Sequence, residues 1–181
     1  MKIEKLKREN KQWIHEGAEL LVVCFEHAWD TKEEALEEME KFVQEERIAL
    51  VAVEEGKVVG MIGAIPSYGQ TGWELHPLAV EPSYQSKGIG TKLVAALEEE
   101  VRKQGGIMIY LGTDDEDGKT SLSEGDLFED TYEKIKNIRN LDRHPYAFYE
   151  KQGYKIVGVF PDANGFGKPD IWMAKRIRNT Y

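Results

Sequence analysis

The stretch WELHPLAVEPSYQSKGIGTKLVAALEEEVRKQGG, residues 73–106, predicts a strand, a glycine-bearing turn and a helix, in that order. Apolar residues recur at helical spacing after Gly88, and charged residues fill the other face. Gly105 and Gly106 supply a stop for the helix. Pro77 lies inside the strand, where a proline removes a ladder donor and favours a β-bulge or a splay.

The turn at residues 85–91, QSKGIGT, is a candidate anion cradle. Glycines let backbone N–H groups approach a phosphate closely, and the helix behind them adds unpaired N–H groups and the positive end of its dipole. The dinucleotide fingerprint G-x-G-x-x-G is incomplete here, and the P-loop pattern is absent. The pattern that remains is Q-x-x-G-x-G after a proline-bearing strand.

Length, charge and cysteine content restrict the class of protein. A chain of 181 residues suits one domain, which we expect to span residues 1–181. No apolar run reaches the roughly 20 residues that span a bilayer, and no signal peptide is evident. Cys24 is the only cysteine, so we expect a cytoplasmic protein without internal disulfides. The net charge of -9 argues against nucleic acid and suits a cationic ligand.

The first half of the chain predicts two helices and a hairpin. Apolar spacing marks one helix over about residues 10–29, and a capping-box pattern at Thr31 opens the next. Two β-branched runs, residues 47–54 and 57–66, flank a hairpin turn at residues 55–56. Trp29, at the junction of the helices, is either a plug of the core or one wall of a binding cleft.

An acid-rich segment, residues 113–130, follows a short apolar run that predicts a buried strand. Open α/β sheets place ligands at such strand ends, although a solvated loop explains the same residues nearly as well. Within this segment, residues 122–127 predict the start of a third helix, which carries Phe128, Tyr132, Ile135 and Ile138 on one apolar face. The acid spacing is not that of an EF-hand, so we expect no metal. Residues 144–154 then predict a short helix, and the chain ends in two strands.

Two motifs resemble the GNAT superfamily of N-acetyltransferases: Q-x-x-G-x-G at residues 85–90 resembles its motif A, and FYEKQGY at residues 148–154 its motif B. The blocks GWELHPL, YLGTDD, HPYAFYEKQGYKIVGV and PDANGFGKPDIWMAK are similar to the aminoglycoside 6'-N-acetyltransferases of the chromosomal Gram-positive type. The resemblance implies an α/β (α+β) fold. Its mixed, mainly antiparallel sheet would be splayed at the bulge, with helices on both faces.

The same resemblance implies the reaction and its partners: acetyl-coenzyme A as co-substrate, the 6'-amino group of an aminoglycoside as acceptor, and a homodimer. It assigns the acetyl group and pantetheine to the backbone of the strand and the pyrophosphate to the turn. The residues so assigned are Leu78, Ala79 and Val80 in the strand and Gln85, Ser86, Lys87, Gly88, Ile89, Gly90 and Thr91 in the turn.

Acetyl transfer also needs a base, a donor to the carbonyl oxygen and an acid for the departing thiolate. We expect Glu74 to deprotonate the amine, with His76 as the alternative base, and the backbone N–H of Leu78 to meet the carbonyl oxygen. Tyr149 is the candidate acid. Trp29, Glu74 and Asp115 are the candidate substrate contacts. The plain alternatives are a salt-bridged strand carboxylate for Glu74, a packed histidine for His76, a core phenol for Tyr149 and a solvated acidic loop.

Two other functions remain open from sequence. One is a GNAT enzyme for another cationic amine, such as a polyamine or a basic protein segment. The other is a coenzyme-A-binding regulatory domain without turnover. The presence of Glu74, Tyr149 and the whole Gln85–Gly90 turn counts against the second.

Overall fold

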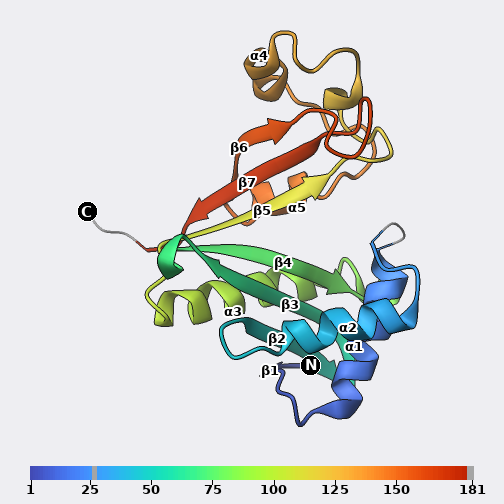
Figure 1. The fold of residues 1–181 in the computed structure, drawn as a ribbon, viewed down its shortest axis with the longest axis vertical. Coiled ribbons are helices and arrows are strands. Elements are labelled where there is room, and N and C mark those ends of the chain that lie inside the picture. Colours follow the sequence, from blue (N-terminus) through green and yellow to red (C-terminus); the bar gives the residue numbers. More distant parts are fainter. Residues whose placement is uncertain (26–27, 179–181) are drawn as a thin grey trace. The chain divides into compact units, whose positions relative to one another are not determined.

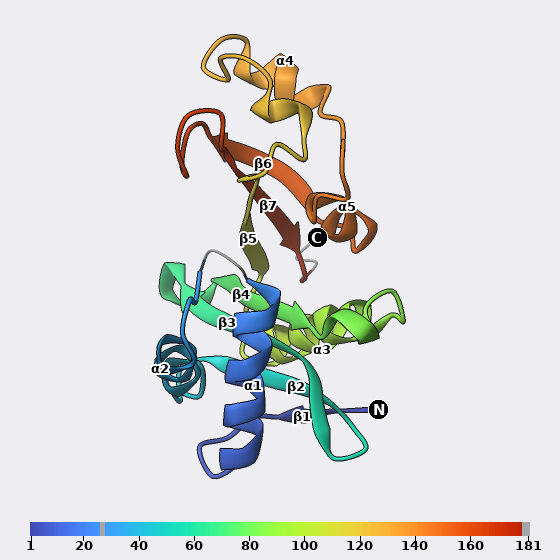
Figure 2. The same ribbon diagram turned by 90° about the vertical axis from the view of Figure 1, so that its right-hand side faces the viewer.

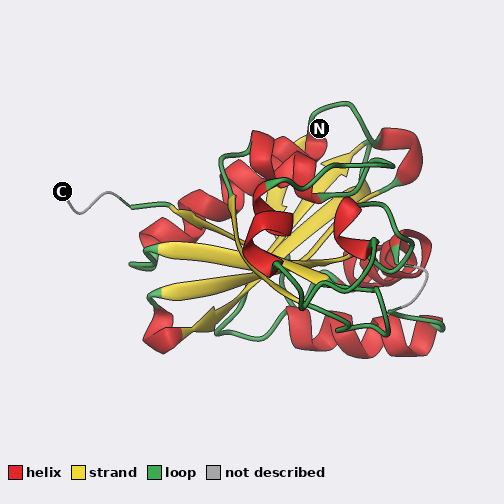
Figure 3. Cartoon of the chain, turned by 90° about the horizontal axis from the view of Figure 1, so that it is seen from above, coloured by secondary structure: helices red, strands yellow, loops and turns green. Residues whose placement is uncertain are grey.

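The computed structural model describes residues 1–25 and 28–178. Its contacts divide the chain into two compact units, described here one at a time: unit 1, residues 1–109 with the residues from Ile177 on, and unit 2, residues 110–176. The expectation of one domain over residues 1–181 stays a prediction. The fold class is confirmed: the chain is a mixture of helices and mainly antiparallel strands (Figure 3).

Unit 1 is a sheet with helices on both faces (Figures 1 and 2). Its strands run in the order β1-β2-β3-β4, and each neighbouring pair is antiparallel. Helices α1 and α2 enclose one apolar core against the sheet, and the buried face of α3 packs on β3 and β2. The elements are β1 (Lys2–Lys5), α1 (Lys11–Cys24), α2 (Lys32–Phe42), β2 (Ile48–Glu54), β3 (Lys57–Ser67), β4 (Gly72–Val80) and α3 (Ile89–Lys103).

The ends of these elements follow the capping rules only in part. The capping box at Thr31 is present in full, and Gly105 and Gly106 close α3 with N–H bonds to the carbonyls of Arg102 and Val101, which is a Schellman ending. Helix α1, however, ends at Cys24 and not near residue 29, and the side chain of Asn10 does not cap it. Strand β1 had no clear signal in the sequence because its pattern is mostly exposed.

The predicted bulge lies in β4. Ile62 pairs with Leu78 and Ala64 with Leu75, so Gly63 alone faces both His76 and Pro77. A Cβ on Gly63 would lie 2.1 Å from the ring of Phe42 and 2.9 Å from the carbonyl oxygen of His76. The bulge is therefore possible because the residue opposite has no side chain. The splay that the sequence associated with it stays a prediction.

Unit 2 holds the strand order β5-β7-β6, with β6 and β7 antiparallel. One face of these strands carries Ile171, Met173 and Leu111, all almost fully buried. The predicted third helix is shorter than expected: α4 has six residues, and Phe128 and Tyr132 are 68% and 87% exposed, so no apolar face forms. The elements are β5 (Met108–Asp114), which begins in unit 1, α4 (Thr131–Lys136), α5 (Tyr146–Lys151), β6 (Lys155–Phe160) and β7 (Asp170–Arg176).

Gly63→Ala should lower the free energy of unfolding by about 2–3 kcal/mol, since the added methyl overpacks the contact with Phe42 and the bulge. Gly158→Ala in β6 is the matched control, because its Cβ would meet nothing within 4 Å. Urea titrations of the three proteins measure the difference. Equal losses for both variants would contradict the steric explanation.

Candidate active site

Strand β4 presents the candidate base residues on one half-buried face. Burial alternates along the strand: Trp73, Leu75 and Ala79 are buried, and Glu74, His76 and Leu78 are half-buried. Glu74 and His76, the two alternative bases, therefore share one face of the strand. In the part of the chain that the structure describes, no basic side chain pairs with Glu74, so the salt-bridged alternative finds no partner there.

The rest of this face comes from α2 and the segment that precedes it. The ring of Trp29 lies 6.1 Å from the ring of His76 and packs edge-on against Phe25 at 5.2 Å. Nε2 of His76 lies 4.0 Å from a carboxylate oxygen of Glu38, which also pairs with Arg47 at 3.5 Å. Trp29 is half-buried, so it borders this site and contacts the core at the same time.

The Gln85–Thr91 turn has the geometry of an anion cradle. Gly88 takes a left-handed conformation with φ 79° as the N-cap of α3, and the first helical bond runs from the N–H of Lys92 to its carbonyl. The N–H groups of the first helical turn precede that bond and have no intrahelical partner. Residues 85–88 are exposed, so an anion can reach them from solvent.

Gly60 fixes where this turn lies on the sheet. A Cβ there would be 3.1 Å from Leu93 and 3.3 Å from Ile89, both in the first turns of α3. The helix start therefore packs directly on the backbone of β3.

The exposed side chain of Gln85 makes a hydrogen bond to the protein's own backbone. Its Nε2 donates to the carbonyl of Val80 at 3.0 Å, and the Sγ of Cys24 donates to the same oxygen at 3.4 Å. One carbonyl at the end of β4 thus joins the turn to the end of α1. Burial raises the pKa of the Cys24 thiol, which indicates a structural thiol and not a nucleophile. Nζ of Lys87 lies 4.7 Å from the centre of the Tyr84 ring, within the turn.

Tyr149 lies on α5 in unit 2 and is buried, 8% exposed. Its ring packs edge-on between Phe148 and Tyr154, at 5.1 Å and 5.8 Å. Burial raises the pKa of the phenol well above its usual value, so it keeps its proton and remains a donor at neutral pH. Phe148 is only half-buried, so Tyr149 is the more buried of these two adjacent aromatic residues.

Asp115 requires a correction, because its carboxylate is 1% exposed and is used by its own loop. It accepts the N–H groups of Lys119 and Thr120 at 2.6 Å and 2.8 Å and the hydroxyls of Thr120 and Ser123 at 2.7 Å and 2.8 Å. Burial opposes ionisation, but these bonds outweigh it and hold the pKa of Asp115 below its usual range. Asp115 therefore organises the loop. Its neighbour Asp114 is exposed at the end of β5.

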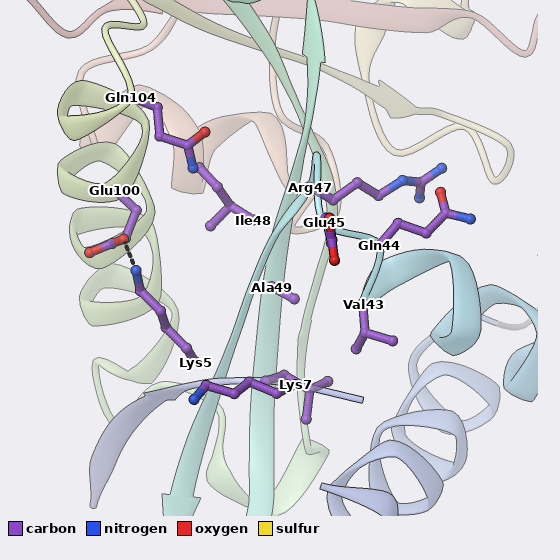
Figure 4. Close-up of a pocket in the computed structure, with 11 residues that line it drawn as sticks. Lys5, Lys7, Val43, Gln44, Glu45, Arg47, Ile48, Ala49, Glu100 and Gln104 are labelled. Carbon is purple, nitrogen blue, oxygen red and sulfur yellow. Dashed lines mark ion pairs between the residues drawn. The ribbon is translucent and has the colours of Figure 1, made fainter. Parts of the chain in front are cut away.

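A hollow of ≈ 220 Å³ lies elsewhere in unit 1 and contains none of the expected site residues (Figure 4). Lys5, Arg47, Glu100 and Gln104 are among its lining residues. Lys5 pairs with Glu100 at 2.5 Å and Arg47 with Glu38 at 3.5 Å, so both of these cations are already neutralised. The described residues contain no cluster of three or more His, Cys, Asp or Glu side chains arranged to hold a metal ion. Over the same residues, no helix is long and apolar enough to cross a membrane.

A bulged strand, a glycine-bearing turn and the helix that follows define the acetyltransferase (GNAT) family, whose sequence pattern matches residues 14–123. The chain belongs to this family. Comparison with curated proteins gave no match.

Three solved structures identify a group within the family to which this chain is similar over its full length. An aminoglycoside 6'-N-acetyltransferase complexed with coenzyme A is 51% identical, with a TM-score of 0.96 over 100% of this chain and 99% of that one. The aminoglycoside 6'-N-acetyltransferase from Enterococcus faecium is also 51% identical, with a TM-score of 0.94 over the same shares. The aminoglycoside 6'-acetyltransferase type Ii is 44% identical, with a TM-score of 0.79 over 100% of both chains.

Gln85→Ala should weaken coenzyme A binding by about 2- to 12-fold, the usual worth of one hydrogen bond. The reason is that the turn loses its bond to Val80 while all backbone N–H groups remain. Gln104→Ala, at the other end of α3 and exposed, is the control. Titration calorimetry with coenzyme A measures both. Unchanged affinity in Gln85→Ala would show that the backbone holds the turn without this side chain.

Proposed function

We propose that this protein transfers the acetyl group of acetyl-coenzyme A to the 6'-amino group of an aminoglycoside. The observation that carries the substrate is full-length identity of 44–51% to aminoglycoside 6'-N-acetyltransferases of solved structure, one of them with coenzyme A bound. The net charge of -9 supports a polycationic acceptor. Such an activity would make the protein an antibiotic-resistance determinant, acting in the cytoplasm, where its single free thiol would remain reduced.

In the proposed reaction the Gln85–Thr91 turn holds the pyrophosphate, and the backbone of Leu78, Ala79 and Val80 holds the acetyl group and pantetheine. Glu74 takes a proton from the substrate ammonium, with His76 as the alternative base. The free amine attacks the thioester carbon, whose oxygen accepts from the N–H of Leu78. The C–S bond then breaks as Tyr149 donates its proton to the departing sulfur, giving coenzyme A, and the proton that leaves the acetylated nitrogen restores the phenol.

On the substrate side, Trp29 and Glu74 remain the proposed contacts, and exposed Asp114 replaces Asp115. Asp117, which is also exposed, pairs with Lys119 at 2.6 Å and is partly neutralised. The carboxylate of Asp114, whose Oδ1 accepts from Nδ2 of Asn164 at 2.5 Å, and that of Glu74 are each suited to contact one ammonium group of such a substrate.

The decisive assay compares acceptors. With acetyl-coenzyme A, release of free thiol should be fast with kanamycin and at least a hundredfold slower, in kcat/KM, with spermidine and a basic peptide. Product analysis by mass spectrometry and NMR should locate the new acetyl group at the 6' nitrogen. Preference for spermidine or the peptide would assign the enzyme to another cationic amine. No thiol release with any amine would support a coenzyme-binding domain without turnover.

Glu74→Gln should lower kcat with kanamycin at least a hundredfold, within the range that general acid–base catalysis contributes. The amide keeps the size and hydrogen bonding of the side chain but cannot accept the proton. Coenzyme A affinity should stay within twofold. Glu81→Gln, at the end of the same strand, is a control for loss of charge. Wild-type turnover in Glu74→Gln would transfer the base role to His76 or water.

We also propose a homodimer, supported by an aromatic cluster on unit 2 in which Phe160 is exposed. Tyr110 stacks on Trp172 at 5.5 Å, and Phe160, 57% exposed, meets the other edge of Trp172 at 5.3 Å. Of residues 171–174 in β7, Trp172 belongs to this cluster, whereas Ile171 and Met173 are fully buried. Light scattering should give twice the chain mass at micromolar concentration, and Phe160→Lys should shift the mass toward the monomer. A monomeric wild type would remove the proposal.

A further inference from the structure

His144 is a buried polar residue that the reaction above does not use. Its side chain lies between the end of β5 and the start of α5, and the residue is only 2% exposed. Its Nε2 lies 3.0 Å from the backbone carbonyl oxygen of Asp114. Its Nδ1 accepts the backbone N–H of Tyr146, the first residue of α5, at 3.3 Å.

These two partners define the protonation state of the ring. A carbonyl only accepts, so Nε2 carries the hydrogen, and an N–H only donates, so Nδ1 is bare. The ring is therefore the neutral Nε2–H tautomer. Burial lowers the pKa of His144 and so favours this neutral form, and the positive charge of Lys119 acts in the same direction. The hydrogen bond to the Asp114 carbonyl and the negative charge of Asp115 oppose this effect by favouring the protonated ring. Protonation of Nδ1 would point its N–H at the backbone N–H of Tyr146, and the hydrogen bond between them would be lost.

The backbone of His144 is fixed as firmly as its ring. Asn140 accepts the N–H of His144 and donates to its carbonyl, both at 2.8 Å. That carbonyl also accepts the N–H of Ala147 at 3.3 Å, and the carbonyl of Pro145 accepts the N–H groups of Phe148 and Tyr149. The side chain and backbone of residues 144–145 thus satisfy all the N–H groups at the start of α5.

A helix of six residues has little stability of its own and depends on such tethers. Among the hydrogen bonds at the start of α5 in the described residues, only the one made by Nε2 of the imidazole reaches a strand of unit 2. That strand is β5, at Asp114. Tyr149 lies one turn further along, on the same side as buried Tyr146. Moving the first turn of α5 moves the phenol with it.

We propose that His144 is a positioning residue for Tyr149: its neutral imidazole ties the Asp114 end of β5 to the first turn of α5 and so fixes the position of the phenol. This inference rests on the proposed function, because it uses the role of Tyr149 as the acid. A displacement of about 1 Å can cost a hundredfold in rate, so the effect belongs on kcat. Binding of coenzyme A to the Gln85–Thr91 turn should be untouched.

Two conservative variants test the two hydrogen bonds of the His144 ring separately. His144→Asn keeps an oxygen where Nδ1 stands and can accept from Tyr146, but it loses Asp114. His144→Gln keeps an N–H where Nε2 stands and can donate to Asp114, but it loses the acceptor for Tyr146. His15→Asn, on an exposed position of α1, is the control. Each variant is measured by single-turnover rate, KM and coenzyme A affinity, in wild-type and Tyr149→Phe backgrounds.

We expect His144→Asn and His144→Gln each to lower the single-turnover rate about tenfold to a hundredfold, with coenzyme A affinity within twofold. Tyr149→Phe should lower it by about a hundredfold. In the Tyr149→Phe background the His144 changes should have little further effect, because His144 acts through the phenol. A loss of equal size in both backgrounds would make His144 a general packing residue and overturn the proposal. So would a wild-type rate in both variants.

Failure of the proposed function would look different. If Tyr149→Phe keeps the wild-type rate, the acid role of Tyr149 is wrong, and the proposal for His144 is overturned with it. If no amine is acetylated, hydrogen exchange still tests the tie: amides of α5 should exchange at least tenfold faster in His144→Ala than in wild type, while α3 is unchanged. Equal protection of α5 in both proteins would overturn the proposal without reference to turnover.

Discussion

The bulge in β4 is the constraint on which the candidate site depends. One extra residue, at His76 and Pro77, faces Gly63, and the absence of a side chain on Gly63 lets the ring of Phe42 and the His76 carbonyl come close. A regular ladder would pair every backbone group of β4 that faces β3. The bulge interrupts that pairing beside Leu78, where the proposed reaction needs an N–H for the thioester oxygen. Glu74 and His76 precede it on the same half-buried face.

A second feature follows at the end of the same strand. The carbonyl of Val80 accepts hydrogen bonds from both Gln85 and Cys24, so the end of α1, the end of β4 and the Gln85–Thr91 turn are joined at one atom. The close packing of α3 on Gly60 fixes the helix start from the other side. An anion cradle made of backbone N–H groups works only if the backbone is held in one shape. In this chain the turn is held by the uncharged side chains of Gln85 and Cys24 and by Gly60 and Gly88.

In unit 2, buried polar residues hold the backbone in one conformation. Asp115 is an ion surrounded by four donors, and His144 is a neutral ring between a carbonyl and an N–H. Buried groups of this kind are costly when unpaired, so each one specifies the loop around it. In the proposed function, Asp114 contacts the substrate and Tyr149 supplies the proton.

The sequence by itself determined the features that depend on local pattern: the bulge at Pro77, the capping box at Thr31, the Schellman glycines and the Q-x-x-G-x-G turn, each of which is a property of a few adjacent residues. It predicted the wrong end for α1 and an apolar face for α4, because exposed Phe128 and Tyr132 have the spacing of core residues without a partner to pack on. Only the tertiary structure decided the role of each acid between residues 114 and 117. Asp114 and Asp115 are identical in chemistry and adjacent in sequence, but strand alternation turns one outward and the other into a ring of donors. The roles of Gln85 and His144 were hidden for the same reason, since their partners are backbone atoms, which every residue has and no pattern of side chains records.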